Sequence, residues 1–212
     1  TGNPVRQNLL ENQTSQEEAR QSFGLEPDKK TVLIVGGSLG ARTVNESVLA
    51  HLDDIRKSNV QFIWQTGKYY SQSISEALEK SEAVPNLKVM DFIGCMDYAY
   101  AAADLVVSRA GASSISELCL LGKPCVLVPS PNVAEDHQTQ NALALSSKDA
   151  AIFVADKEAK EKLVQTALET VTNDERLLSL SENVKKLAFL NSSDIIAEEV
   201  YKLAVEYKKR NN

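Results

Sequence analysis

The sequence has few of the residues that form metal centres or disulfide frameworks. Among its 212 residues there are three cysteines and two histidines. Cys95, Cys119 and Cys125 lie in apolar stretches and form no Cys-x-x-Cys pair, so we interpret them as reduced core residues. No Asp-x-Asp pair lies in a loop suited to a metal ion. We therefore expect neither a metal site nor a bound cofactor.

The sequence also lacks a membrane span, a signal peptide and a basic face. No apolar run approaches the roughly 20 residues that a spanning helix requires. Acidic residues number 29 against 23 basic ones, a formal net charge of −6. Nucleic acid is not expected as a partner, because its binders need a basic surface. The opening, residues 1–6, resembles a loop and has no Met, so we expect an excised domain whose partner half is missing.

Short apolar runs alternate with stretches of helical periodicity along most of the chain. The runs are apolar on both faces, which favours a parallel sheet covered by helices on each side. The predicted fold is α/β, a Rossmann-like doubly wound sheet of about six strands. We expect one domain over residues 1–190 and a separate C-terminal helix in 191–212. The expected strands are 31–35, 60–64, 87–91, 104–108, 125–128 and 151–154; the expected helices are 41–57, 69–81, 96–102, 113–121, 136–147, 157–170, 174–187 and 193–208.

Two glycine-containing loops each follow a strand and precede a helix. In 36–40, Gly-Gly-Ser-Leu-Gly, glycines let the backbone approach a ligand, and the helix start favours an anion such as phosphate. A tight strand-to-helix turn is the simpler interpretation. The second loop, 108–117, places Glu117 on the first turn of its helix. That carboxylate is either a helix-start acid or an acceptor for two ribose hydroxyls.

Three further segments are candidates for ligand contacts. Residues 136–141, Asp-His-Gln-Thr-Gln-Asn, offer imidazole and amide groups suited to sugar hydroxyls, with Asp136 as the expected N-cap. In 91–96, either a flat base bonds the main chain of Phe92 or Ile93, or these apolar residues only anchor the loop. Arg6 is either a solvated loop residue or a positioned cation, since its Gly, Asn and Pro neighbours restrict the backbone.

Together these motifs resemble the MurG family of GT-B glycosyltransferases. The matching runs are T-G-N-P-V-R, G-G-S-L-G-A-R, D-F-I, S-R-A-G-A-S-S-I-S-E and D-H-Q-T-Q-N-A, in the family's order over residues 1–142. Each run is unspecific by itself, but the set is highly specific. The resemblance implies the C-terminal, donor-binding half of the enzyme, with the last helix packing toward the missing N-terminal domain.

The resemblance also implies roles for individual residues. The main chain of Ile93 would bind uracil, Arg6 would lie near the base, and Glu117 would accept the ribose hydroxyls. Some members carry two glutamines at the position of His137-Gln138, whereas others have the same His-Gln pair. The diphosphate and sugar would be surrounded by Gly37, Ser38, Gly40, Arg109, Gly111, Ala112, Ser113, Ser114, His137, Gln138 and Asn141.

The reaction implied is an inverting transfer of N-acetylglucosamine from UDP-N-acetylglucosamine to undecaprenyl-pyrophosphoryl-muramoyl-pentapeptide, which converts lipid I to lipid II in peptidoglycan synthesis. The general base, the lipid I site and the contact with the cytoplasmic face of the inner membrane would belong to the N-terminal domain. This chain should then bind the donor and transfer little by itself, with no catalytic residue of its own.

Two alternatives remain at the level of sequence. Another GT-B enzyme, such as a glycolipid transferase or a UDP-N-acetylglucosamine 2-epimerase, would share the loops; an epimerase should carry more acids and histidines near the sugar. A non-catalytic NAD module would need Gly-x-Gly-x-x-Gly and an acid at the end of the second strand, and residues 61–65 end without one.

Overall fold

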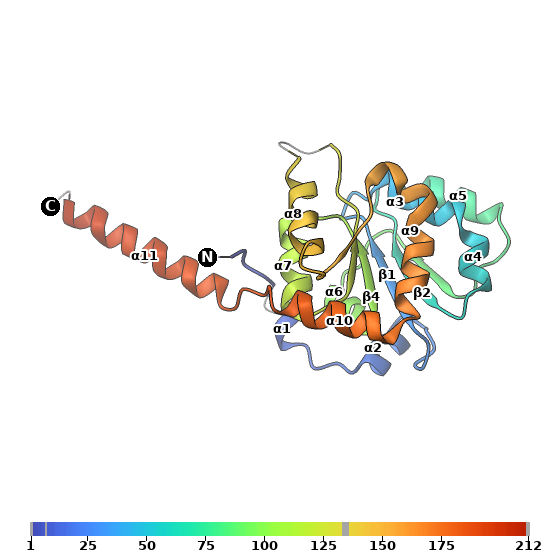
Figure 1. Ribbon diagram of the computed structural model, residues 1–212, viewed down its shortest axis with the longest axis horizontal. Coiled ribbons are helices and arrows are strands. Elements are labelled where there is room, and N and C mark those ends of the chain that lie inside the picture. The colour runs from blue at the N-terminus through green and yellow to red at the C-terminus, as the bar shows by residue number, and fades with distance from the viewer. Residues whose placement is uncertain (1, 7, 133–135, 211–212) are drawn as a thin grey trace.

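The computed structural model describes residues 2–6, 8–132 and 136–210, and it contains one sheet covered by helices on both faces (Figure 1). The sheet has six strands, all parallel, in the order β3-β2-β1-β4-β5-β6. The predicted α/β doubly wound fold is thereby confirmed. The strands are β1 Thr31–Val35, β2 Gln61–Gln65, β3 Leu87–Met90, β4 Leu105–Ser108, β5 Cys125–Leu127 and β6 Ile152–Phe153.

Most of the helices connect one strand to the next. Those in the described residues are α1 Asn8–Glu11, α2 Gln16–Ser22, α3 Arg42–Ala50, α4 Leu52–Lys57, α5 Ser71–Glu79, α6 Met96–Ala102, α7 Ala112–Leu121, α8 His137–Ser146, α9 Asp156–Val171, α10 Asp174–Lys185 and α11 Ser192–Arg210.

The core consists of two apolar layers, one on each face of the sheet. Successive residues of a strand point to opposite faces, so Leu33 contributes to the layer under α2, α6 and α7, whereas Ile34 contributes to the layer under α3 and α9. The central strands are buried along their whole length. Their near-continuous apolar sequence follows from this two-sided burial.

The strand order places a topological switch point between β1 and β4. The chain leaves β1 toward β2 through α3 and α4, and it leaves β4 toward β5 through α7. The two connections diverge to opposite sides, so a crevice opens beyond the carboxyl ends of these adjacent strands. Both glycine-containing loops begin at this crevice.

The structure differs from the expectations at several points. Cys95, expected in the core, is exposed at the N-cap position of α6, whereas Cys119 and Cys125 are buried as expected. The helix predicted over 41–57 is broken at His51, whose φ of −122° and ψ of 28° separate α3 from α4. Helices α1 and α2 were not predicted, although Ser15 and Glu18 form a capping box that marks the start of α2. Asp136 is at the N-cap position of α8 but makes no capping bond to the backbone; its carboxylate accepts from Thr139 Oγ1 at 2.6 Å.

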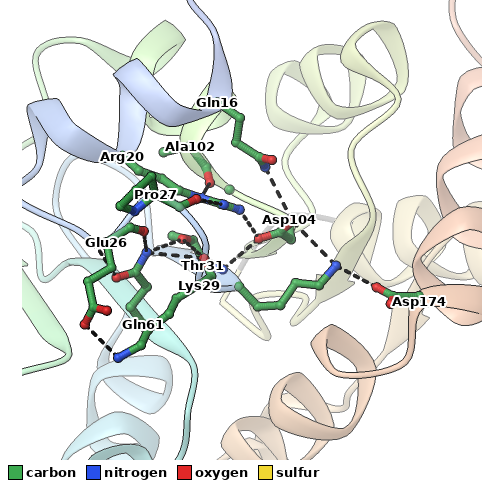
Figure 2. A network of polar contacts seen from close by, with 12 residues as sticks. Gln16, Arg20, Glu26, Pro27, Lys29, Thr31, Gln61, Ala102, Asp104 and Asp174 are labelled. Atoms are coloured by element: carbon green, nitrogen blue, oxygen red, sulfur yellow. Dashed lines mark hydrogen bonds and ion pairs between the residues drawn. The ribbon is translucent and has the colours of Figure 1, made fainter.

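A polar network closes the opposite edge of the sheet, where the strands begin (Figure 2). The buried Arg20 guanidinium pairs with Asp104, with Nη2 and Oδ2 2.6 Å apart, and also donates to the main-chain oxygens of Ala102 and Pro27. Asp104 Oδ2 in turn accepts from the N–H of Thr31 at 2.7 Å. The network joins α2 to the first residue of β1 and to the residue that precedes β4.

The last helix, α11, extends away from the sheet (Figure 1). The proposed division between residues 190 and 191 falls in the short segment between α10 and α11. Val200, Tyr201, Leu203 and Tyr207 on α11 are exposed by 60% or more. Within the described part of the chain, none of the helices combines the length and the apolar composition of a membrane span.

Candidate nucleotide-binding site

A cavity of about 840 Å³ lies at the carboxyl edge of the sheet, over the switch point. Its volume falls within the usual range for small-molecule sites. The loops after β1, β2, β3, β4 and β5 contribute to its walls, together with the N-terminal segment and the start of α9. Ten of the fourteen candidate ligand residues line it: Arg6, Gly37, Ser38, Gly40, Ile93, Arg109, Gly111, Ser114, Glu117 and Gln138.

The glycine loop after β1 packs backbone to backbone against the loop after β2. Gly40 has a φ of +86°, and a Cβ there would come within 2.2 Å of the Thr66 carbonyl oxygen. Gly67 has a φ of +83°, and its Cβ would come within 2.2 Å of the Gly40 nitrogen. Side chains at either position would push the two loops apart. Gly67 was not among the residues predicted from the sequence.

Helix α3 directs its N-terminus at the cavity from this loop. Its N-cap residue, Ala41, supplies no side-chain capping bond, so the first N–H groups of the helix lack a capping side chain. Asn45, buried on α3, donates to the Thr66 carbonyl at 2.8 Å and accepts from Trp64 Nε1 at 3.0 Å. These bonds fix α3 against the end of β2 and so hold the glycine loop in place.

The second loop brings another uncapped helix N-terminus to the cavity. Gly111 is the N-cap of α7 and has no side chain with which to cap it. Arg109, just before it, turns inward: its Nη1 pairs with Asp156 at the start of α9 and donates to the carbonyls of Val128 and Pro129 at 3.2 and 3.1 Å. Arg109 therefore lines the cavity while it holds the loop after β5 and the start of α9 together.

Glu117 projects into the cavity from the second turn of α7. It does not lie on the first turn, as expected, because the helix already begins at Ala112. Its carboxylate accepts two bonds from Arg6, Nε to Oε1 at 2.9 Å and Nη2 to Oε2 at 3.1 Å, and a third from the Tyr100 hydroxyl at 3.0 Å. The Glu117 side chain is 11% exposed and that of Arg6 is 49% exposed. The hydrogen bond to Glu117 raises the pKa of Arg6 above its ordinary value. Burial is the main cause that raises the pKa of Tyr100, so its hydroxyl stays a donor.

The loop after β3 supplies the apolar end of the cavity. Phe92 is half exposed and Ile93 is buried. The main-chain N–H of Ile93 is already bonded, because it donates to Gln65 Oε1 at 2.9 Å. The Ile93 N–H is therefore available to a ligand only if its bond to Gln65 breaks.

Four candidate residues do not line this cavity in the described structure. Ala112 and Asn141 line a neighbouring hollow of about 570 Å³ between α7 and α8. The Asn141 amide donates to the Ala110 carbonyl at 3.1 Å, which fixes the second loop from behind. Ser113 and His137 are exposed on the first turns of α7 and α8. Gln138, in contrast, reaches the cavity and accepts from the N–H of Ser130 at 2.9 Å.

Comparison with known families agrees with this geometry. Residues 31–198, well over half of the chain, match the model of the glycosyltransferase family 28 C-terminal domain. This chain belongs to that family. The match runs from the first residue of β1 into α11, so it includes both helix N-termini that face the cavity, while Arg6 precedes it.

Relatives of this family 28 domain include two transferases that share most of its sequence. It is 62% identical over 205 residues to a UDP-N-acetylglucosamine--N-acetylmuramyl-(pentapeptide) pyrophosphoryl-undecaprenol N-acetylglucosamine transferase of Bacteroides fragilis, covering 96% of this chain and 54% of the relative. The transferase of the same name from Phocaeicola vulgatus is 59% identical over 211 residues, covering 100% and 56%. The chain thus spans about half the length of the curated relatives it matches.

A solved structure supports the same relationship. The crystal structure of Acinetobacter baumannii MurG superposes with a TM-score of 0.75 at 27% identity, covering 95% of this chain and 56% of that one. The resemblance to the MurG family inferred from the motifs is confirmed.

Gln65 and Tyr100 are further site residues, besides Gly67, that the motifs did not indicate. Tyr100 lies on α6, 17 positions before Glu117, and no sequence pattern links the two. The position of Gln65 could have indicated its role, because it is the last residue of the second strand, where an NAD-binding fold carries an acid that contacts the ligand.

Proposed function

We propose that this domain binds UDP-N-acetylglucosamine as the donor half of an inverting transferase that converts lipid I to lipid II. The observation that supports it is the meeting, in one cavity, of two uncapped helix N-termini and the Glu117 carboxylate. Such a set suits a diphosphate joined to a ribose. The activity named for the relatives is of the same kind.

The diphosphate is proposed to lie between the starts of α3 and α7. Each terminus offers N–H groups and roughly half a positive charge. Ser38 and Ser114 line the cavity beside them and can add hydroxyl donors. We propose that these groups stabilise the charge that develops on UDP as it leaves, and that no metal takes part.

The ribose is proposed to bind Glu117 by exchange with Arg6. A carboxylate offers about four acceptor positions, and Arg6 and Tyr100 already use three. Two ribose hydroxyls therefore fit only when the Arg6 guanidinium withdraws from at least one oxygen. The half-exposed Arg6 can make that movement toward the base, while the buried Tyr100 keeps the carboxylate aimed into the cavity.

The sugar is proposed to lie toward α8. Gln138 reaches this side of the cavity, and Asn141 supports the loop beneath it. His137, exposed at the first residue of α8, could turn to the sugar or its phosphate when the donor is bound.

The other half of the reaction is assigned to a domain beyond this chain. We propose that an N-terminal domain supplies the general base and the lipid I site, and that the whole protein lies on the cytoplasmic face of the inner membrane. The exposed apolar side chains of Val200, Tyr201 and Leu203 on α11 would pack against that domain, because contiguous exposed apolar surface marks interaction sites. This chain by itself is expected to bind donor without transferring sugar.

The proposal is tested by calorimetric titration of the chain with UDP-N-acetylglucosamine, UDP, UDP-glucose and NAD. We expect UDP and UDP-N-acetylglucosamine to bind and NAD not to. Glu117→Gln should raise the dissociation constant of UDP by about 10- to 100-fold, because hydrogen bonds to a charged group contribute roughly 1.5–3 kcal/mol to binding.

The control for this variant is Glu175→Gln, which removes an exposed carboxylate in the first turn of α10, away from the residues that line the cavity. It should leave UDP affinity unchanged. Absence of UDP binding at millimolar concentration, or equal effects of the two substitutions, would contradict the proposal. Sugar transfer by the chain alone would contradict the assignment of the base to another domain.

A further inference from the structure

Gln65 is the last residue of β2, and its neighbours in the sheet are the last residues of two other strands. It pairs in register with Val35 of β1 on one side and with Met90 of β3 on the other. The loops that leave those two strands form the glycine loop and the loop of Ile93. A side chain at this point can therefore reach both loops.

The Gln65 amide is bonded at both ends, once to each loop. Its Nε2 donates to the Gly37 carbonyl at 3.0 Å, and its Oε1 accepts from the Ile93 N–H at 2.9 Å. The residue is only 5% exposed. Since an amide donates from nitrogen and accepts at oxygen, rotating it would break both bonds, and a carboxylate could make only one of them.

The backbone beyond Gln65 adds ties to the same two loops. The N–H of Gly67 donates to the Asp91 carbonyl at 3.1 Å, and that of Lys68 donates to the Ser38 carbonyl at 3.4 Å. The segment after β2 thus lies as a spacer between the glycine loop and the Ile93 loop, with the Gln65 side chain at its base.

We propose that Gln65 is a positioning residue that fixes the separation between the diphosphate loop and the base loop. This inference rests on the function proposed above. Because the distance between the two loops is fixed, a ligand that contacts Gly37 and Ile93 together binds more tightly than one that contacts either alone. Gln65 also determines which group the base meets: it occupies the Ile93 N–H and leaves the carbonyl. That carbonyl accepts from the N3–H of uracil, whereas N3 of cytosine has no hydrogen to give.

Two substitutions separate the two bonds. Gln65→Met keeps the length of the side chain and removes both, whereas Gln65→Glu keeps the acceptor for Ile93 and loses the donor to Gly37. The readouts are the dissociation constants of uridine, UDP and CDP measured by calorimetry. The ratio of the uridine constant to the UDP constant reports how much the diphosphate adds to the base.

In Gln65→Met we expect this ratio to fall by about 3- to 10-fold, the equivalent of one net hydrogen bond, and the preference for UDP over CDP to fall with it. In Gln65→Glu the ratio should fall while the preference for UDP over CDP persists. The inference is overturned if Gln65→Met weakens uridine and UDP by the same factor, or changes neither.

The matched control is Gln61→Met. Gln61 is a buried glutamine at the other end of the same strand, where it bonds Glu26 and Thr31. Its loss should lower the unfolding temperature and leave both ratios unchanged. If the wild-type chain fails to bind UDP, the proposed function itself is wrong. If it binds UDP but Gln65→Met leaves both ratios of dissociation constants unchanged, only the proposed role of Gln65 is wrong.

A measurement on the wild type covers the case in which the variants do not fold. Amide hydrogen exchange followed by NMR should show the Ile93 N–H protected in the ligand-free chain, compared with that of the exposed Gly94. It should stay protected when UDP is added. Equal exchange at the two amides, or loss of Ile93 protection on binding UDP, would overturn the inference.

Discussion

The pair of Arg20 and Asp104 gives a stability prediction whose magnitude follows from its partners. Their side chains are 7% and 13% exposed. Breaking a buried pair from one side costs about 3–5 kcal/mol, because the remaining charge stays buried. Asp104→Leu leaves Arg20 with only the carbonyls of Ala102 and Pro27, so we expect a loss of about 3–4 kcal/mol.

The opposite substitution should cost less. In Arg20→Met, Asp104 keeps the Thr31 N–H at 2.7 Å and has Lys30 Nζ 3.9 Å away. We therefore expect a loss of about 2–3 kcal/mol. The double variant should lose less than the sum of the two, since it leaves no unpaired charge.

Urea unfolding at pH 7 measures these losses, and thermal unfolding should show a fall of about 6–12 °C for a 3 kcal/mol loss in a chain of this size. The network lies where β1 and β4 begin and the cavity where they end, so UDP affinity should not change below the unfolding temperature. Additive losses, single losses below about 1 kcal/mol, or a weakened UDP affinity would show that Arg20 and Asp104 do not stabilise the fold as a buried pair.

Three further predictions concern the loops, a buried amine and the thiols. Gly40→Ala should destabilise the chain by more than Gly37→Ala, by about 2 kcal/mol or more, since both have a φ of +86° but only Gly40 lacks room for a Cβ; equal urea midpoints would contradict this. Burial lowers the pKa of Lys123 to about 8 from 10.5, so the folded state takes up fewer protons and stability should rise between pH 8 and 10.5; the rise should be absent in Lys123→Met. Thiol labelling at pH 7.5 should modify the exposed Cys95 first, because burial raises the pKa of Cys119 to about 11.

The sequence could predict where the cavity lies because that information is local. Apolar runs such as 31–35 and 104–108 can be buried on both faces only in a parallel sheet with covering helices, and the carboxyl ends of such strands meet at one edge. The glycine loops follow those runs directly, so their place at the edge was predictable. The differences from the predicted helices are also local: a capping box at Ser15 starts α2, and a break at His51 interrupts an otherwise continuous helical pattern.

The direction of the polar side chains was decided by the tertiary structure alone. Arg109 and Asn141 carry donors that could contact a ligand. In the structure they donate to main-chain carbonyls of other loops instead. Glu117 accepts a hydrogen bond from Arg6, 111 positions away in the sequence, and Gln65 accepts one from the Ile93 N–H, 28 positions away. Periodicity and backbone preference act over a few residues, so they predict the strands, most of the helices and the strand ends that meet at the crevice. A hydrogen bond forms only when donor and acceptor lie about 2.7–3.2 Å apart. Whether two loops remote in the chain come that close depends on how the helices and strands pack.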